Sequence, residues 1–146
     1  MPSRKLTDLL PSVQKAAAAA LLDCKEQGFD VLVTSTFRSP KEQEAEFLAK
    51  HSKARAWQSY HQYKRALDIV VMRNGKCIWN PKTAEDIALW NSVGNIFINH
   101  GFEWAKYWKS FPELAHFQVT EGKHWRVLQK ELGVITGQIT NLPKGY

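Results

Sequence analysis

The segment Arg65–Met72, which reads RALDIVVM, constrains the fold more than any other part of this chain. Its run of apolar and β-branched side chains is typical of a buried strand. Asn74-Gly75 follows directly and is the strongest short signal for a two-residue hairpin turn, so Lys76–Trp79 is predicted to return as an antiparallel partner. The chain is therefore expected to build an antiparallel sheet around this hairpin.

Helices and further strands are predicted on both sides of the hairpin. Three helices carry a capping or breaking residue at an end, namely Pro11 to Gly28, Lys41–Lys50 after Ser39, and Thr83 to His100. Two more strands are expected at Asp30–Phe37 and His116–Thr120. His124–Leu132 has helical potential, and the tail Asn141–Tyr146 is expected to fray. This order predicts a small α+β domain, with a mainly antiparallel sheet and about three helices.

Length and composition limit the class of protein. With 146 residues the chain has the size of one domain, and 44% hydrophobic against 23% charged residues excludes a disordered chain. The longest apolar run, Ala16–Leu22, is far shorter than the ~20 residues that span a bilayer, so no transmembrane segment is expected. The N-terminal residues show no secretory signal. Cys24 and Cys77 are too few for a disulfide framework and are expected to be reduced.

Asp68 is the charged residue inside the apolar strand. A buried carboxylate must be paired or must bind a cation, because an isolated buried charge costs several kcal/mol. A salt bridge to Arg65 or another base is one explanation, and a metal site shared with His61 is the other. Side chains seven residues apart in one strand lie on opposite faces, so the two can converge only if His61 lies on a turn that enters the strand.

A second group of candidate residues lies in the aromatic-rich segment 101–118. Glu113 and His116 are three residues apart, after a turn that Pro112 can start. Two imidazoles and one carboxylate would suit Zn²⁺ and leave a fourth position for water, with Glu113 as the general base beside it. Taken alone, His116 also fits a core histidine among aromatic neighbours.

Arg38 lies just past the end of a predicted strand, in the segment TSTFRSPKEQ. A guanidinium group at such a position can hold a substrate carboxylate or polarise a carbonyl through paired hydrogen bonds. A surface ion pair with Glu42 is the alternative explanation. The segment alone does not separate the two.

Taken together and in this order, three motifs resemble a known family. They are T-S-x-x-R-S at 34–39, S-x-H-x6-D at 59–68, and E-W-x3-W-x-x-F-x-E-x-x-H-F at 103–117. The pattern is similar to that of the zinc peptidases of family M15, the LAS metallopeptidases, which cut bacterial cell-wall peptides. The similarity is greatest to the L-alanyl-D-glutamate endopeptidases that many bacteriophages use as endolysins, and it implies a Hedgehog/DD-peptidase-like fold.

The resemblance implies a role for each matching residue. His61, Asp68 and His116 would bind Zn²⁺, and Glu113 would be the catalytic acid and base. Arg38 and Ser59 would face the substrate, Arg38 also acting in catalysis. Glu103 and Trp104 match an E-W pair that would support the site.

The chain departs from the family pattern at several positions. Lys64 stands where relatives have glycine, so an ordinary backbone conformation is expected there. Glu113 replaces the usual aspartate, which retains the carboxylate but lengthens its reach. The whole of 1–146 is interpreted as one catalytic domain with its motifs within 34–118, and 121–146 is an extension of unclear role.

The resemblance predicts an enzyme that hydrolyses the L-alanyl-D-glutamate bond of peptidoglycan stem peptides. A D-Ala-D-Ala carboxypeptidase or dipeptidase with the same zinc site is the alternative, because the bond that is cut depends on the depth of the cleft. As a phage endolysin the protein would be a monomer made in the cytoplasm of the host cell, without a signal peptide. It would reach periplasmic peptidoglycan, and lyse the host, after another protein opens the membrane.

The net charge of +6, from 20 Lys and Arg against 14 Asp and Glu, favours an anionic partner. Residues 47–67 contain basic and aromatic residues and no acid, a composition that also suits a non-catalytic module binding single-stranded nucleic acid. Such a module would leave the histidines and Asp68 unexplained. Attraction to the anionic outer envelope of a bacterium, and not to nucleic acid, is therefore predicted.

Overall fold

The hairpin predicted around Asn74-Gly75 is present in the computed structural model, which describes residues 2–146. Strand β2 (Ala66–Arg73) pairs with β3 (Lys76–Ile78) in antiparallel orientation. Both turn residues have positive φ, 52° at Asn74 and 75° at Gly75, as a type I′ hairpin turn requires. The strongest local signal in the sequence therefore forms as predicted.

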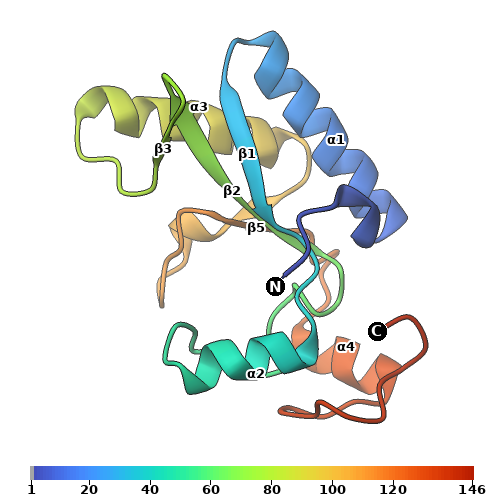
Figure 1. The fold of residues 1–146 in the computed structure, drawn as a ribbon. Coiled ribbons are helices and arrows are strands. Elements are labelled where there is room, and N and C mark those ends of the chain that lie inside the picture. Colours follow the sequence, from blue (N-terminus) through green and yellow to red (C-terminus); the bar gives the residue numbers. More distant parts are fainter. Residues whose placement is uncertain (1) are drawn as a thin grey trace.

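Strand β2 is the centre of a five-stranded sheet in which every pairing is antiparallel (Figure 1). The order of the main path is β1-β2-β5-β4, with β1 at Asp30–Ser35, β5 at His116–Gln118 and β4 at Glu103–Trp104. β5 pairs with the first residues of β2 and β3 pairs with its last. The two-residue strand β4 was not predicted, because two residues are too few to show alternation.

In the described part of the chain, four α-helices accompany the sheet: α1 (Pro11–Glu26), α2 (Pro40–Leu48), α3 (Ala84–Asn99) and α4 (Trp125–Leu132). The α+β prediction is confirmed, and the helical potential of the C-terminal segment is realised as α4. The sequence-predicted caps also form, since Ser39 closes a capping box with Glu42 and the Thr83 hydroxyl accepts from the backbone N–H of Asp86. No helix among residues 2–146 is both long and apolar enough to cross a membrane.

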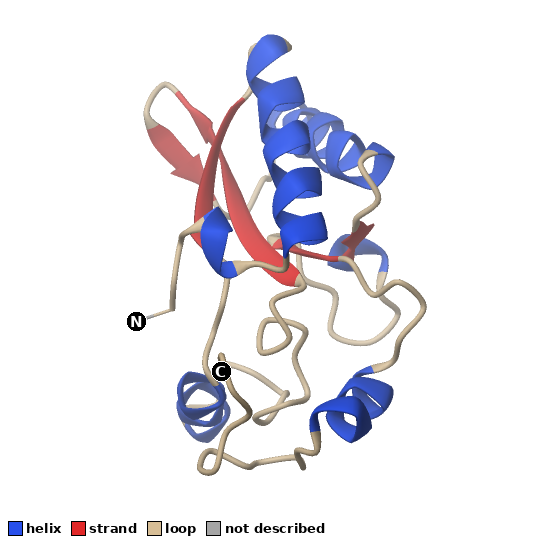
Figure 2. Cartoon of the chain, turned by 90° about the vertical axis from the view of Figure 1, so that its right-hand side faces the viewer, coloured by secondary structure: helices blue, strands red, loops and turns tan. Residues whose placement is uncertain are grey.

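Helices α1 and α3 pack on one face of the sheet and form the main core with it (Figure 2). One stripe of α1, including Val13 and Ala17, is fully buried there, as its spacing predicted. On α3, Gly94 leaves room for the indole of Trp104, because a Cβ at this position would lie 2.2 Å from the ring. The two cysteines are free, Cys24 buried in this core and Cys77 exposed.

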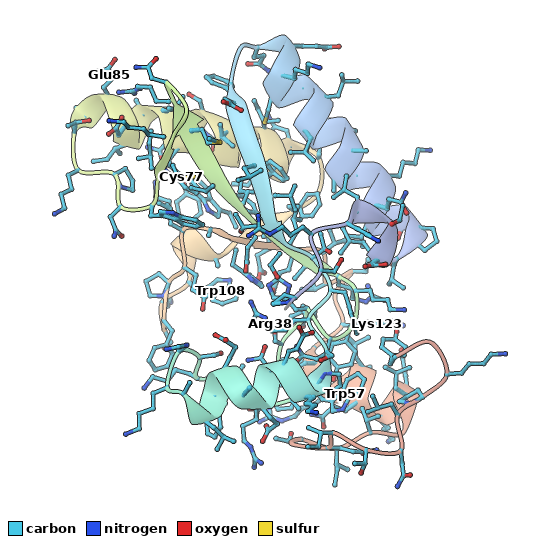
Figure 3. All side chains as sticks on the ribbon, viewed as in Figure 1. Arg38, Trp57, Cys77, Glu85, Trp108 and Lys123 are labelled. Carbon is cyan, nitrogen blue, oxygen red and sulfur yellow. The ribbon has the colours of Figure 1, made fainter. Side chains whose placement is uncertain are left out.

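A second apolar cluster lies apart from this core, and Figure 3 shows one of its members, Trp57, near α2 and α4. It joins Trp57, Tyr60 and Tyr63 of the loop before β2 to Leu128 of α4 and to Val134. The described residues therefore form two apolar clusters, the core between the sheet and helices α1 and α3 and the smaller cluster around Trp57.

Two local predictions are wrong. Lys64 does not hold an ordinary backbone conformation, since its φ is 61°, in the left-handed region. Its ammonium group donates to the carbonyl oxygen of Gly145 at 2.7 Å and lies 4.5 Å from the ring centre of Tyr146. The tail is not frayed either, because the ring of Tyr146 also packs 5.7 Å from Trp57. These contacts hold both the C-terminal tail and the strained turn.

Candidate active site and its metal-binding group

His61, Asp68 and His116 converge at one end of β2. One possible ligand atom from each lies within 4.8 Å of the other two. Oδ1 of Asp68 is 3.2 Å from Nε2 of His61 and 3.3 Å from Nδ1 of His116. All three side chains are largely buried, with 2%, 20% and 7% of their surfaces exposed, respectively. The sequence-predicted group is thus brought together in space.

The sheet register and a turn produce this convergence. Asp68 on β2 lies directly opposite His116 on β5, and side chains of opposed residues in an antiparallel pair lie side by side. His61 belongs to the turn at 60–64 that enters β2, the arrangement that a seven-residue offset requires. The left-handed Lys64 closes this turn by donating its N–H to the carbonyl oxygen of His61 at 3.4 Å.

The hydrogen bonds of the two imidazoles leave a lone pair of each ring facing Asp68. Nδ1 of His61 lies 2.6 Å from the carbonyl oxygen of Thr36, which can only accept, so this nitrogen carries the hydrogen and Nε2 does not. Nε2 of His116 lies 2.8 Å from Oε1 of Gln118, so Nδ1 of His116 is likewise free of hydrogen. A metal-binding histidine is usually held by its other ring nitrogen in this way.

Glu103 sets the orientation of the Gln118 amide. Its Oε2 accepts hydrogen bonds from Nε2 of Gln118 at 2.7 Å and from the indole N–H of Trp108 at 3.0 Å. A carboxylate cannot donate, so the nitrogen end of the amide must face Glu103 and the oxygen end must face His116. Which ring nitrogen of His116 carries the hydrogen therefore depends on a chain of hydrogen bonds that runs through Gln118 to Glu103.

The donor set fits a divalent metal ion. Two imidazole lone pairs and a carboxylate oxygen converge with no hydrogen between them in the neutral state, an arrangement that a cation stabilises. Burial by itself would raise the pKa of Asp68, but when the rings carry a second proton, the charge of His61 and hydrogen bonds from both imidazoles hold that pKa well below its usual range. Burial likewise opposes protonation of His116, yet Asp68 raises its pKa. A proton and a metal ion would thus compete for one position.

Arg38 contacts the outer oxygen of this carboxylate. Its Nη2 lies 3.5 Å from Oδ2 of Asp68, and its Nη1 donates to Oε1 of Gln43 at 3.0 Å. The ion pair of Asp68 is therefore made with Arg38, whereas Arg65 pairs with Glu121 at 3.2 Å. By contacting Oδ2, Arg38 holds the Asp68 carboxylate with Oδ1 turned toward the two imidazoles.

Gln43 in turn orients the guanidinium group of Arg38 through their hydrogen bond. This fully buried side chain accepts from Arg38 and Gln62 and donates to Ser52 and to the carbonyl oxygen of Ala54. Sequence reasoning missed Gln43, because it stands in the charged segment KEQE and gives the signal of a surface residue. Gln118 and Thr36 were missed for a related reason, since their roles depend on strand pairing and on the chain path.

Glu113 and Ser59 lie at the edge of the group. Oε2 of Glu113 is 3.9 Å from Nδ1 of His116, and its side chain is 56% exposed. The turn that carries it is held by the indole N–H of Trp104, which donates to the carbonyl oxygen of Leu114 at 2.7 Å. The hydroxyl of Ser59 accepts from the backbone N–H of His61 at 3.3 Å. Both side chains therefore remain within reach of a ligand beside the imidazoles.

A cleft of about 690 Å³ opens over these residues. The sheet contributes one wall and the layer that contains α2 and α4 contributes the other, and Arg38 and Trp108 lie between them (Figure 3). The charged lining residues are mostly acidic: Glu46, Asp68, Glu103 and Glu113 against Arg38 and Lys123. The positive charge of the chain therefore lies mainly outside the cleft.

Comparison with known proteins gives matches in sequence and in fold. Residues 52–119 match a family described as D-alanyl-D-alanine carboxypeptidase. The chain is 32% identical over 124 residues to the peptidoglycan L-alanyl-D-glutamate endopeptidase CwlK of Bacillus subtilis (strain 168), covering 77% of this chain and 74% of CwlK.

Two solved structures share the fold at lower identity. The L-Ala D-Glu endopeptidase ChiX of Serratia marcescens has a TM-score of 0.65 at 21% identity, covering 82% of this chain and 89% of ChiX. The vancomycin resistance D,D-pentapeptidase VanY, as an E175A mutant in complex with Zn(II), has a TM-score of 0.55 at 14% identity, covering 86% of this chain and 80% of VanY.

Proposed function

The chain belongs to the M15 family of metallopeptidases and is a peptidoglycan-cleaving hydrolase, and from this premise we propose that it is a zinc endopeptidase for the L-alanyl-D-glutamate bond of stem peptides. The family is the one that the three sequence motifs predicted. The choice of bond is supported by CwlK and ChiX, both of which are described as endopeptidases for this linkage. The choice of zinc is supported by the donor set and by the Zn(II) in VanY.

One observation carries the proposal. Nε2 of His61, Nδ1 of His116 and Oδ1 of Asp68 converge within 4.8 Å, with both imidazole lone pairs turned inward and a cleft directly above them. These residues would hold Zn²⁺, which would supply a Lewis acid that acidifies water and polarises the scissile carbonyl.

The remaining chemistry belongs to the side chains at the edge of the group. Glu113 accepts a proton as water attacks the carbonyl carbon and returns it to the departing amine nitrogen. Its carboxylate lies 3.9 Å from Nδ1 of His116 and is 56% exposed, so a peptide and a water molecule in the cleft can both approach it. Arg38 keeps Asp68 oriented and contributes positive charge where negative charge develops on the carbonyl oxygen, and Ser59 contacts the peptide.

Lysis of outer-membrane-permeabilised bacteria tests this function. The purified protein should reduce the turbidity of the suspension, a chelator should abolish the effect and added Zn²⁺ should restore it. Glu113→Gln should remove lysis while the protein still binds one zinc, whereas His61→Ala should lose the zinc itself. Lysis by Glu113→Gln at the wild-type rate would refute the role of Glu113, and an undiminished zinc content in His61→Ala would refute the ligand set.

A D,D-carboxypeptidase is the second candidate, because the matched family carries that description and VanY is a D,D-pentapeptidase. Mass spectrometry of a muropeptide digest separates the two reactions. A new N-terminal D-glutamate indicates the endopeptidase, and loss of a terminal alanine indicates the carboxypeptidase.

We further propose a role as a bacteriophage endolysin that acts as a monomer, made in the cytoplasm and drawn to an anionic envelope by its basic residues. The support is the similarity of the motifs to the endolysin branch, together with a positive charge that lies mainly outside the cleft. Co-expression with a membrane-pore protein should cause host lysis that neither protein causes alone. Added salt should slow lysis of permeabilised cells, since it screens attraction to the envelope.

A further inference from the structure

The segment 120–125 builds one wall of the cleft, although it lies beyond residues 52–119 that match the family. Lys123, His124 and Trp125 line the same cavity as the three candidate metal ligands. Figure 3 shows Lys123 and Arg38 in the space between the sheet and the layer of α2 and α4. The extension of unclear role therefore contributes side chains to the active-site cleft.

This wall is held in place by contacts with the loop before β2. The hydroxyl of Tyr60 donates to the carbonyl oxygen of Lys123 at 2.6 Å. The ring of Tyr63 belongs to the apolar cluster against which Trp125 packs, and its hydroxyl, which donates to the carbonyl oxygen of Trp57 at 2.6 Å, lies 3.4 Å from the carbonyl oxygen of Trp125. Leu128 anchors the following helix α4 in the second apolar cluster. The side chains of the wall are thus presented on a fixed backbone, as a binding site requires.

Lys123 and His124 bring hydrogen-bond donors to a cleft whose charged lining residues are mostly acidic. Nδ1 of His124 accepts from the backbone N–H of Arg126 at 3.2 Å, so the hydrogen of the neutral ring is on Nε2. The side chain of Lys123 is 42% exposed, and its ammonium group pairs with Glu131 at 2.9 Å. Exposed ion pairs of this kind are weak, so a ligand can replace Glu131.

Lys123 is the more exposed of the two cations among the described lining residues, at 42% against 17% for Arg38. Arg38 is held by Asp68 and Gln43 and is assigned to the scissile carbonyl, so Lys123 is the cation left for a second acidic group of the substrate. A carboxylate entering the cleft would be repelled by Glu103 and Glu113 and attracted to Lys123 and His124. The charge distribution therefore selects one place for an acidic substrate group.

We propose that Lys123 and His124 form a subsite for the free carboxylate of the D-glutamate residue in the stem peptide, with the ring of Trp125 beside it. The proposal rests on the proposed endopeptidase function. In an L-alanyl-D-glutamate link the amino group of D-glutamate is in the scissile bond, and only one of its two carboxyl groups continues the chain. Its other carboxyl group remains free close to the reacting carbonyl, where a charged hydrogen bond can orient the peptide.

A pair of synthetic stem peptides tests the subsite, one with this carboxylate free and one with it converted to a carboxamide. Lys123→Met should raise KM for the free acid about tenfold with kcat within twofold, and should leave KM for the carboxamide unchanged. Glu131→Gln should lower KM for the free acid by up to about fivefold, because Lys123 loses its competing partner. Lys130→Met is the matched control, since Lys130 is an exposed lysine on α4 outside the cleft lining.

Peptide binding to a Glu113→Gln background gives a second measurement that does not depend on turnover. The Kd for the free acid should weaken about tenfold with Lys123→Met and should not change with Lys130→Met. An equal response of both peptides to Lys123→Met, in KM and in Kd, would overturn the subsite. Failure of the wild-type zinc enzyme to cleave either peptide would instead overturn the proposed function, and the Kd comparison would still decide the subsite.

Discussion

Replacing Gln118 with leucine should weaken zinc binding without unfolding the protein. In the native chain, Gln118 accepts the Nε2–H of His116 at 2.8 Å and thereby keeps Nδ1 free of hydrogen and turned toward Asp68. Leucine has a similar volume but no acceptor, so the buried N–H of His116 loses its partner. The bond should matter most when metal is bound, because withdrawal of electrons from the ring makes the N–H a stronger donor.

The size of the effect follows from burial. His116 and Gln118 are 5% and 4% exposed, so water cannot replace the lost acceptor. Without metal, the ring of the variant can carry its hydrogen on Nδ1 and donate to Asp68, whereas a metal at Nδ1 leaves the N–H on Nε2 without an acceptor. The cost of an unsatisfied buried donor, about 1–3 kcal/mol, therefore arises on metal binding. This energy corresponds to a weakening of the Kd for zinc by roughly fivefold to 150-fold. Removal of a group that supports a metal ligand typically weakens metal affinity by about 10- to 100-fold, which lies within this range. A loss of about 30-fold is expected.

Competition with a chromophoric zinc chelator would measure this Kd, with circular dichroism to verify folding. Gln129→Leu is the matched control, because this partly buried glutamine also loses hydrogen bonds, to Trp57 and Thr136, but lies away from the imidazoles. Glu103→Gln should weaken zinc binding by several-fold, since the Gln118 amide is then free to reverse. A folded Gln118→Leu protein with the wild-type Kd would refute the reasoning.

Three further predictions concern stability and reactivity. Replacing glycine with alanine usually stabilises a helix, but in Gly94→Ala the new methyl group would clash with Trp104. Overpacking of this kind costs about 1–3 kcal/mol, so Tm should fall by several degrees in a thermal melt. An unchanged or higher Tm would contradict the contact. Burial raises the pKa of the Cys24 thiol to about 11, so at pH 8 a maleimide should label Cys77 alone, and a second thiol should react only in denaturant. Tyr146→Ala should lower the free energy of unfolding by about 1–2 kcal/mol in a urea titration, as expected for lost aromatic contacts, whereas a frayed tail would give no change.

Local patterns in the sequence determined most of the elements. The hairpin at Asn74-Gly75, the capped start of α2 after Ser39 and the buried stripe of α1 depend on residues within a few positions of one another, which side-chain periodicity and turn chemistry report directly. The placement of His61 on a turn could also be predicted, because no strand brings it to the same face as Asp68.

Only the tertiary structure decided how the site is completed. Asp68 meets His116 through the register of β2 against β5, two strands separated by more than forty residues, and no local preference specifies that register. Gln43 and Gln118 look like surface residues in the sequence, because a buried amide is recognised only when the groups that satisfy its hydrogen bonds are in place. Lys64 adopts a left-handed conformation against its intrinsic preference, held there by the C-terminal tail.

The same holds for the wall that carries Lys123 and His124. The sequence by itself determined the chemistry of this protein, since residue types at motif spacing specify which groups can bind metal and move protons. It could not determine the extent of the cleft, because the free energy that positions a C-terminal segment comes from packing against a loop some sixty residues away, at Tyr60 and Tyr63. Packing between distant segments is a property of the folded chain alone.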